Sequence, residues 1–314
     1  MARAVVYTEN GGPEVLRIVE IADAEPRAGE VRVAVRAAGV NPIDWKLRAG
    51  LRGPGSGGVE QRVGSDAAGV VDAVGEGVTD VAIGDEVIVR DARGAYATHV
   101  VARAEQLVPK PAELSWEQAA SIGIPVGTAY QALRSLDVGE GDTLLLPGGA
   151  GGVGQAAIQF ARDAGATVIA TASEGNHDRI RSLGAIPVEY GDGLAGRVAA
   201  LAPQGVTVAL DAVGTDEAVE TSLQLVADRD RVGTVVRGAD AAGWGIRAWG
   251  GGSPVPLTDA EKAWRRDATA LAARRAAEGG FDLEVSGRYR LDEAADAHRQ
   301  SEAGHVRGKI VIAI

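Results

Sequence analysis

The 314-residue sequence contains no cysteine, one methionine and two phenylalanines. The absence of cysteine excludes disulfides, iron–sulfur clusters, cysteine-ligated zinc and thiol nucleophiles. Basic residues are outnumbered by acidic ones, giving a formal net charge of −11, so we expect repulsion from nucleic acid and from anionic membranes. An anionic ligand would therefore need a local site, such as the amino end of a helix.

Long hydrophobic runs are missing as well. The sequence contains no stretch of about eighteen apolar residues, the length that is needed to span a bilayer. The first residues, MARAVVYTENGG, lack the apolar core of a signal peptide. We therefore expect a soluble, cytoplasmic protein.

The first third of the chain has a β-strand pattern. EVRVAVRAAGV alternates apolar and polar residues, and the runs around residues 67–89 are interrupted by glycine turns, which predicts a small antiparallel barrel. The segment LSWEQAASIG predicts a helix with Ser115 as N-cap and Gln118 at the capping-box position.

After Gly141 the pattern changes to apolar strands that alternate with helices. DTLLLP, ATVIATAS, GVTVALDAVG and RVGTVVRGA predict strands, and the segments between them predict helices. This order is typical of a doubly wound parallel sheet covered on both faces. Residues 239–256 fit neither pattern, residues 259–278 predict an amphipathic helix, and GKIVIAI predicts a closing strand.

A G-x-G-x-x-G motif is formed by Gly149, Gly151 and Gly154, directly after one of these strands and at the start of a helix. Glycine lets the backbone turn sharply and approach a pyrophosphate, and the helix amino end supplies N–H donors. The G-x-x-x-x-G-K-[ST] loop is excluded because no Lys-Ser or Lys-Thr follows. The alternative is a tight turn without ligand; we interpret the loop as a dinucleotide site.

The residues after the second strand indicate which dinucleotide is bound. NAD enzymes place an acidic residue there, about 20 residues after the glycines, whereas this sequence has Ser173. Together with Asn176, His177 and Arg179 it suits the 2′-phosphate of NADPH. Glu174 argues the other way, and a helix cap with a solvated face is the alternative for these polar side chains.

Several ordered segments together resemble the medium-chain dehydrogenase/reductase superfamily, in its zinc-independent quinone oxidoreductase (zeta-crystallin-like) branch. These segments are YTENGGPEVL, AAGVNPIDWKLRAG, VGSDAAGVVDAVGEGVTDVAIGDEV, GTAYQAL, GGAGGVG, YRLDEAADAH and GKIVI. The resemblance implies a GroES-like β-barrel catalytic domain over residues 1–120, a Rossmann NADPH-binding domain over residues 121–258, and a return to the catalytic domain over residues 259–314.

Site residues follow from the same resemblance. It implies that Asn41 and Lys46 are catalytic and lie near the nicotinamide. It also implies that Thr128 binds the cofactor near the nicotinamide. A plain turn residue for Asn41 and a plain surface residue for Lys46 are the alternatives. The remaining residues that it implies at the cofactor are Ala150, Gly151, Gly152 and Val153 along the pyrophosphate, Tyr190 near the adenosine phosphate, and Val236, Arg237, Gly238 and Trp249 around the nicotinamide.

No metal is expected. Zinc-dependent members carry a cysteine in the segment matching AAGVN and a G-H-E motif in the segment matching GSD; here Asn41 and Ser65 occupy those places, and neither is a good zinc ligand. The four histidines are scattered without ligand spacing. Without zinc to polarise a carbonyl, the expected substrate is a quinone or an activated C=C bond.

Two alternatives remain open: an enoyl reductase of a biosynthetic pathway, and a non-catalytic NADPH-binding structural or sensor protein. The strand GIRAWGG resembles the edge that pairs between subunits in this branch, so we also expect a homodimer.

Overall fold

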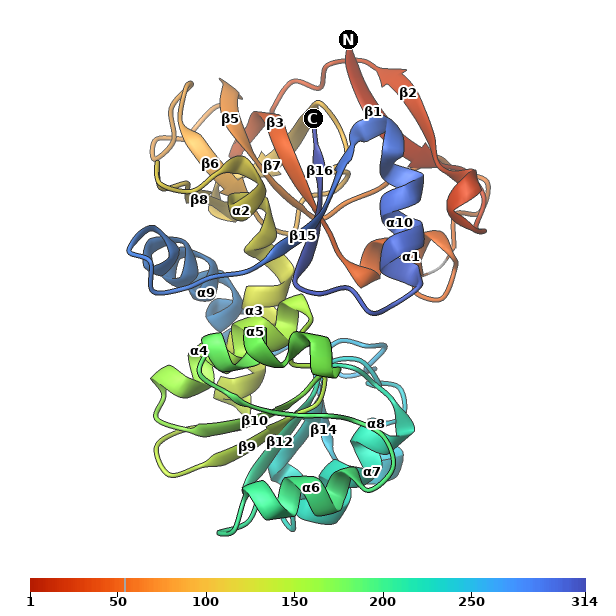
Figure 1. Ribbon diagram of the computed structural model, residues 1–314. Helices are drawn as coiled ribbons and strands as arrows, with labels where there is room; N and C mark the ends of the chain where they lie inside the picture. Colours follow the sequence, from red (N-terminus) through yellow and green to blue (C-terminus); the bar gives the residue numbers. More distant parts are fainter. Residues whose placement is uncertain (54) are drawn as a thin grey trace. The chain divides into compact units, whose positions relative to one another are not determined.

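The chain folds into two compact units in a computed structural model that describes residues 1–53 and 55–314 (Figure 1). The first unit comprises Met1–Ile124 and Thr269–Ile314, and the second comprises Pro125–Ala268. Within the described residues, no helix combines the length and the apolar composition needed to cross a bilayer.

The larger sheet of the first unit is built around β3 (Glu30–Val40), whose alternating sequence buries every second side chain at its start. β3 pairs antiparallel with β5 (Asp66–Val74) and with β16 (Lys309–Ala313), and β16 pairs in parallel with β15 (Val285–Arg290). The last strand of the chain therefore lies inside this sheet.

The two sheets of this unit have the strand orders β15-β16-β3-β5-β6-β8, with β7 also paired to β3, and β2-β1-β4. Apolar side chains of both sheets, together with Tyr96 from the segment before β7, form a core that includes Val33, Val71 and Ile310. The strands not yet given are β1 (Ala2–Tyr7), β2 (Arg17–Ile21), β4 (Gln61–Arg62), β6 (Glu86–Val89), β7 (His99–Arg103) and β8 (Leu107–Pro109).

Three helices accompany these sheets: α1 (Pro42–Arg48), α2 (Trp116–Ser121) and α10 (Ala294–Glu302). The predicted capping box of α2 is confirmed. Ser115 Oγ accepts the N–H of Gln118 at 3.2 Å, and Gln118 Oε1 accepts the N–H of Ser115 at 2.9 Å. The helix begins here because both otherwise unpaired amides are satisfied.

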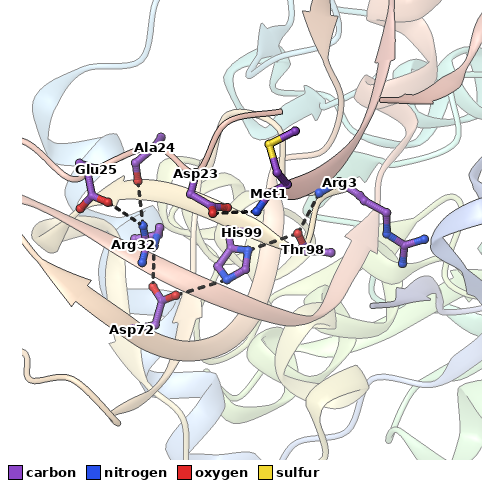
Figure 2. A network of polar contacts seen from close by, with 9 residues as sticks. All are labelled: Met1, Arg3, Asp23, Ala24, Glu25, Arg32, Asp72, Thr98 and His99. Atoms are coloured by element: carbon purple, nitrogen blue, oxygen red, sulfur yellow. Dashed lines mark hydrogen bonds and ion pairs between the residues drawn. The ribbon is translucent and has the colours of Figure 1, made fainter. Parts of the chain in front are cut away.

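A polar network holds the amino terminus onto the first unit (Figure 2). The terminal amine of Met1 is 2.9 Å from Asp23 Oδ2. Nearby, Asp72 accepts from Arg32 Nε at 2.9 Å and lies 3.3 Å from His99 Nε2, so it links β3, β5 and β7. His99 thus has a carboxylate partner two strands away, on the other side of β3.

The second unit confirms the predicted parallel sheet. Its strand order is β11-β10-β9-β12-β13-β14, and the pairings are parallel throughout. Its strands are β9 (Thr143–Leu146), β10 (Thr167–Thr171), β11 (Ile186–Val188), β12 (Val208–Asp211), β13 (Val232–Thr234) and β14 (Arg247–Ala248).

Helices cover both faces of this sheet (Figure 1), with α4 and α5 on one side and α6 and α7 on the other. Such coverage explains why the central strands are almost wholly apolar. The helices within this unit are α4 (Gly152–Asp163), α5 (His177–Ser182), α6 (Leu194–Leu201), α7 (Asp216–Leu225) and α8 (Ala241–Trp244). Two further helices run across the boundaries between the units: α3 (Gly123–Ser135) begins in the first unit and α9 (Asp259–Ala277) ends in it.

Candidate functional site

The glycine motif forms the turn between β9 and α4. Gly148 has φ +87°, in the region that favours glycine, and its N–H donates to Thr171 Oγ1 at 3.0 Å. The N–H of Gly149 donates to Thr171 O at 3.0 Å, so the turn is attached to the end of β10. Gly151 is the N-cap of α4 and has no side-chain cap. The turn is thus held from one side by β10.

The three motif glycines serve different purposes. A Cβ on Gly154 would lie 2.2 Å from Gly148 O, and a Cβ on Gly149 would lie 2.7 Å from Ala170 Cβ, so both positions require glycine for packing. A Cβ on Gly151 would meet only Gly148 O, at 3.7 Å. Within this unit, Gly151 therefore has no packing reason to be glycine. Close approach of a ligand to the backbone supplies one.

Exposure along the turn agrees with this division. Ala150, Gly151, Gly152 and Val153 are all partly exposed, whereas α4 is buried from Gly154 to Ala161. The first-turn N–H groups of α4 are therefore accessible, and together with the helix dipole they suit a phosphate. These residues fit the pyrophosphate of a dinucleotide.

The polar residues predicted to select NADPH cluster directly after β10. Asn176 Nδ2 donates to Ser173 Oγ at 3.0 Å, and His177 Nε2 lies 3.3 Å from Ala172 O. Glu174 is exposed in the same turn. Tyr190 follows the neighbouring strand β11 and is 48% exposed. Because parallel strands end at one edge of the sheet, the structure brings these residues to the same edge as the glycine turn.

Arg179 lies one turn further along, on α5. Its Nη2 donates to Gln155 Oε1 at 2.7 Å, and Gln155 Nε2 donates to Ala150 O at 3.0 Å. Arg179 is therefore connected through Gln155 to the glycine turn. Gln155, which directly follows the last motif glycine, is not among the residues predicted from the sequence.

The residues predicted to surround the nicotinamide follow β13. Val236 and Arg237 are partly exposed and Gly238 is buried. The guanidinium of Arg237 binds Asp216 at 2.9 Å and Asp240 at 2.5 Å, and these carboxylates raise its pKa. Arg237 thus holds the starts of α7 and α8 together.

Trp249 and Thr128 are both buried. Trp249 is 5% exposed, and its Nε1 donates to Glu261 Oε1 at 2.7 Å. Thr128 lies in α3 and is 8% exposed. A Cβ on Gly238 would lie 2.1 Å from Gly250 O, so the backbone beside Trp249 packs directly against Gly238. Trp249 supports the loop after β13 from within the unit.

In the first unit, Asn41 is 2% exposed and its amide is fully engaged. Its Nδ2 donates to Asp66 Oδ2 at 2.9 Å, and its Oδ1 accepts from Lys309 Nζ at 2.7 Å. Lys309 Nζ also donates to Val40 O at 2.7 Å. Asn41 therefore joins β3, the start of β5 and the last strand β16.

Two buried carboxylates flank Asn41. Asp44 Oδ2 accepts from the N–H of Asn41 and from the hydroxyl of Tyr96, both at 2.9 Å. Burial raises the pKa of Asp44 to about 6, against the lowering effect of these hydrogen bonds. Burial also raises the pKa of Asp66, and the ammonium of Lys309 opposes that rise. Burial lowers the pKa of Lys309 itself.

Lys46 differs from Asn41 in being partly exposed. Its Nζ lies 5.5 Å from the ring centroid of Trp45, and partial burial lowers its pKa, with the charge of Arg52 adding to the effect. A lysine with a lowered pKa releases a proton more readily than an ordinary surface lysine.

Four residues of this network were not predicted from the sequence: Asp44, Asp66, Tyr96 and Lys309. A charged residue opening the otherwise apolar strand KIVIA was the available signal for Lys309. Within residues 1–53 and 55–314, no three histidine, aspartate or glutamate side chains are grouped so that they could hold a metal ion.

Comparisons with known proteins agree with both units. Residues 27–112 match the alcohol dehydrogenase GroES-like domain, and residues 184–312 match the zinc-binding dehydrogenase family. A quinone oxidoreductase of Pseudomonas aeruginosa is 34% identical over 333 aligned positions, which cover 99% of each chain.

Solved structures give the same result. The quinone oxidoreductase of Coxiella burnetii is 30% identical with a TM-score of 0.83, covering 100% of this chain and 99% of that one. The Escherichia coli quinone oxidoreductase, solved in complex with NADPH, is 27% identical with a TM-score of 0.85, covering 99% of this chain and 100% of that one. The chain therefore belongs to the quinone oxidoreductase family of the medium-chain dehydrogenase/reductase superfamily, with a GroES-like unit and a Rossmann unit.

Proposed function

We propose that this protein is an NADPH-dependent oxidoreductase that transfers a hydride to a quinone or to an activated C=C bond. The observation that carries the proposal is the open position of Gly151 beside the accessible first turn of α4. That turn can bind a pyrophosphate through backbone amides alone. The relatives named above support the reaction class.

The preference for NADPH rests on the residues after β10. Ser173 stands where NAD enzymes place a carboxylate, and Asn176 holds its hydroxyl in place. With His177 and the nearby Arg179, this cluster offers donors to a 2′-phosphate and no buried acid. Losing one charged contact to that phosphate costs about 1.5–3 kcal/mol, or roughly 10- to 150-fold in affinity.

Zinc independence rests on the donors at the family's ligand positions. Asn41 Oδ1 already accepts from Lys309, and Ser65 offers a neutral hydroxyl that is 3.3 Å from Asp44 Oδ1. Neither is a favoured zinc ligand. A quinone or enone suits such a site because it delocalises the incoming charge without a Lewis acid.

Bound NADPH supplies the hydride, and the chain's own residues bind and orient the cofactor and the substrate and shield them from water. Asn41 contributes through the buried network that fixes β3 and β16, and Lys46 assists protonation weakly. General acids typically contribute about 10²–10⁴-fold. Lys46→Ala should therefore lose less than about 100-fold in kcat, and a loss of three orders of magnitude with NADPH binding intact would identify Lys46 as the proton donor.

The central experiment measures NADPH and NADH binding, and then oxidation of each with quinones, enones and enoyl thioesters. Gly151→Ala should abolish NADPH binding while leaving the fold intact, because its Cβ meets no packing atom closer than 3.7 Å. Gly196→Ala is the matched control, since a Cβ there meets nothing within 4 Å.

Each outcome of this experiment has a distinct meaning. Turnover with enoyl thioesters alone would establish the enoyl reductase alternative, and binding without any turnover would establish the non-catalytic one. Equal affinity for NADPH and NADH would refute the cofactor preference. Failure of the wild-type protein to bind either nucleotide would refute the proposal as a whole.

A further inference from the structure

A buried carboxylate ends the strand β12. Asp211 is 2% exposed, and its Oδ1 accepts the N–H of Val213 at 3.0 Å and the N–H of Gly214 at 2.7 Å. Its Oδ2 accepts from the hydroxyl of Thr234 at 2.7 Å. One carboxylate thus fixes the loop after its own strand and also contacts the neighbouring strand.

Thr234, the last residue of β13, repeats this arrangement one strand further. It is fully buried and lies directly opposite Asp211 in the parallel register. Its hydroxyl oxygen accepts the N–H of Val236 at 3.1 Å and the N–H of Arg237 at 3.0 Å. Because the hydroxyl proton is given to Asp211, both lone pairs are available to the loop amides.

The two loops held in this way contact each other and the glycine turn. A Cβ on Gly214 would lie 2.6 Å from Val236 Cγ1, and a Cβ on Gly148 would lie 3.1 Å from Val213 Cβ. The N–H of Ala212 also donates to Pro147 O at 3.0 Å. The two side chains therefore determine the position of a continuous rim beside the glycine turn.

We propose that Asp211 and Thr234 are positioning residues for the nicotinamide half of NADPH. They act through the backbone of residues 213–214 and 236–237 and do not touch the cofactor themselves. Two buried side chains thus orient four backbone N–H groups. Loss of the Thr234 hydroxyl would release the loop after β13 and would leave the Asp211 carboxylate without one of its donors. The adenosine half, bound after β10, does not depend on this pair. The inference rests on the proposed function.

The test compares Thr234→Val, which keeps the shape and loses the hydroxyl, with Thr234→Ser, which keeps the hydroxyl. Binding is measured for NADPH and for 2′,5′-ADP, which carries only the adenosine half. We expect Thr234→Val to bind NADPH about 10-fold more weakly or worse, to bind 2′,5′-ADP unchanged within about two-fold, and Thr234→Ser to bind NADPH like the wild type.

Other results would overturn the positioning role. Unchanged NADPH affinity in Thr234→Val would do so, and so would equal weakening of both ligands, which indicates general loosening of the unit. Failure of the wild type to bind NADPH would instead refute the proposed function, so the two failures are distinguishable.

Amide hydrogen exchange on the wild-type protein tests the same inference without any variant. Residues 213, 214, 236 and 237 should be protected in the absence of nucleotide, because their partners are buried side chains. Rapid exchange at these amides would contradict the positioning role even if Thr234→Val does not fold. Asp211→Asn should raise their exchange rates, and unchanged rates in that variant would also contradict it.

Discussion

Replacing Lys309 by methionine should strongly destabilise the first unit. The change keeps a similar chain length and removes the ammonium that donates to Val40 O and Asn41 Oδ1, each at 2.7 Å. Both acceptors are buried and would lose their donor. At about 2 kcal/mol for each unsatisfied acceptor, the loss is about 4 kcal/mol, within the range of about 3–5 kcal/mol for breaking a buried charged pair. That is a large share of the stability of an ordinary domain.

Urea unfolding of Lys309→Met and wild type, followed by circular dichroism, measures this loss. Hydrogen exchange assigns it to a unit, with protection expected to fall in β3 and β16. Lys262→Met is the matched control: that side chain is 54% exposed and pairs with Asp259 at the surface. Its change should stay within about 0.5 kcal/mol.

A second substitution tests the electrostatic part of the argument. In the Lys309→Met background, Asp66→Asn should recover about 1 kcal/mol or more, because a neutral amide no longer needs a cation beside it. A Lys309→Met variant within about 1 kcal/mol of wild type would refute the reasoning. Further destabilisation by Asp66→Asn would refute the role of charge.

Three further predictions concern packing, pH and assembly. Gly154→Ala should lower the melting temperature markedly, since its Cβ would lie 2.2 Å from a backbone oxygen, whereas Gly196→Ala should be neutral or stabilising by up to about 1 kcal/mol; equal melting temperatures would contradict the packing role. Burial lowers the pKa of His298 to about 3, below its unfolded value, so the stability that the neutral His298 contributes is fully present above about pH 6.5 and is lost as pH falls toward 3. In His298→Leu, the unfolding free energy relative to wild type should therefore rise by about 1.4 kcal/mol for each unit by which the pH is lowered from 6 to 4. Denaturation curves that give the same difference in unfolding free energy at every pH would refute this. Because β14 is the last strand in its sheet, light scattering at micromolar concentration should show a homodimer, and a monomer would contradict pairing at that edge.

Local signals predicted much of the fold. The sequence predicted the Ser115 capping box, the apolar strands after Gly141 and the glycine turn, because each depends on residues within a few positions of one another. The same holds for the polar cluster after β10, where Ser173 and Asn176 are three residues apart and bond directly.

Long-range polar contacts could not be predicted in this way. Lys309 and Asn41 are 268 residues apart, and Arg48 and Glu302 are 254 apart, yet each pair is joined at 2.7 Å. Nothing in the local pattern around Asn41 indicates that a lysine near the other end of the chain saturates its amide. Likewise, Asp211 and Thr234 end separate strands, and only the parallel register makes them neighbours.

The central place of β16 has a consequence for biosynthesis. Pro125–Ala268 form a contiguous stretch that is complete once synthesised, so the second unit can fold while the ribosome is still translating. The first 124 residues emerge earlier but cannot complete their larger sheet until β16 fills the position between β3 and β15. During that interval β7 covers only the first part of this edge of β3, and Ala37–Val40 stay unpaired until β16 arrives. An unpaired strand edge is the kind of surface that chaperones bind and at which aggregation begins. The unit whose synthesis begins first is thus the unit that is completed last.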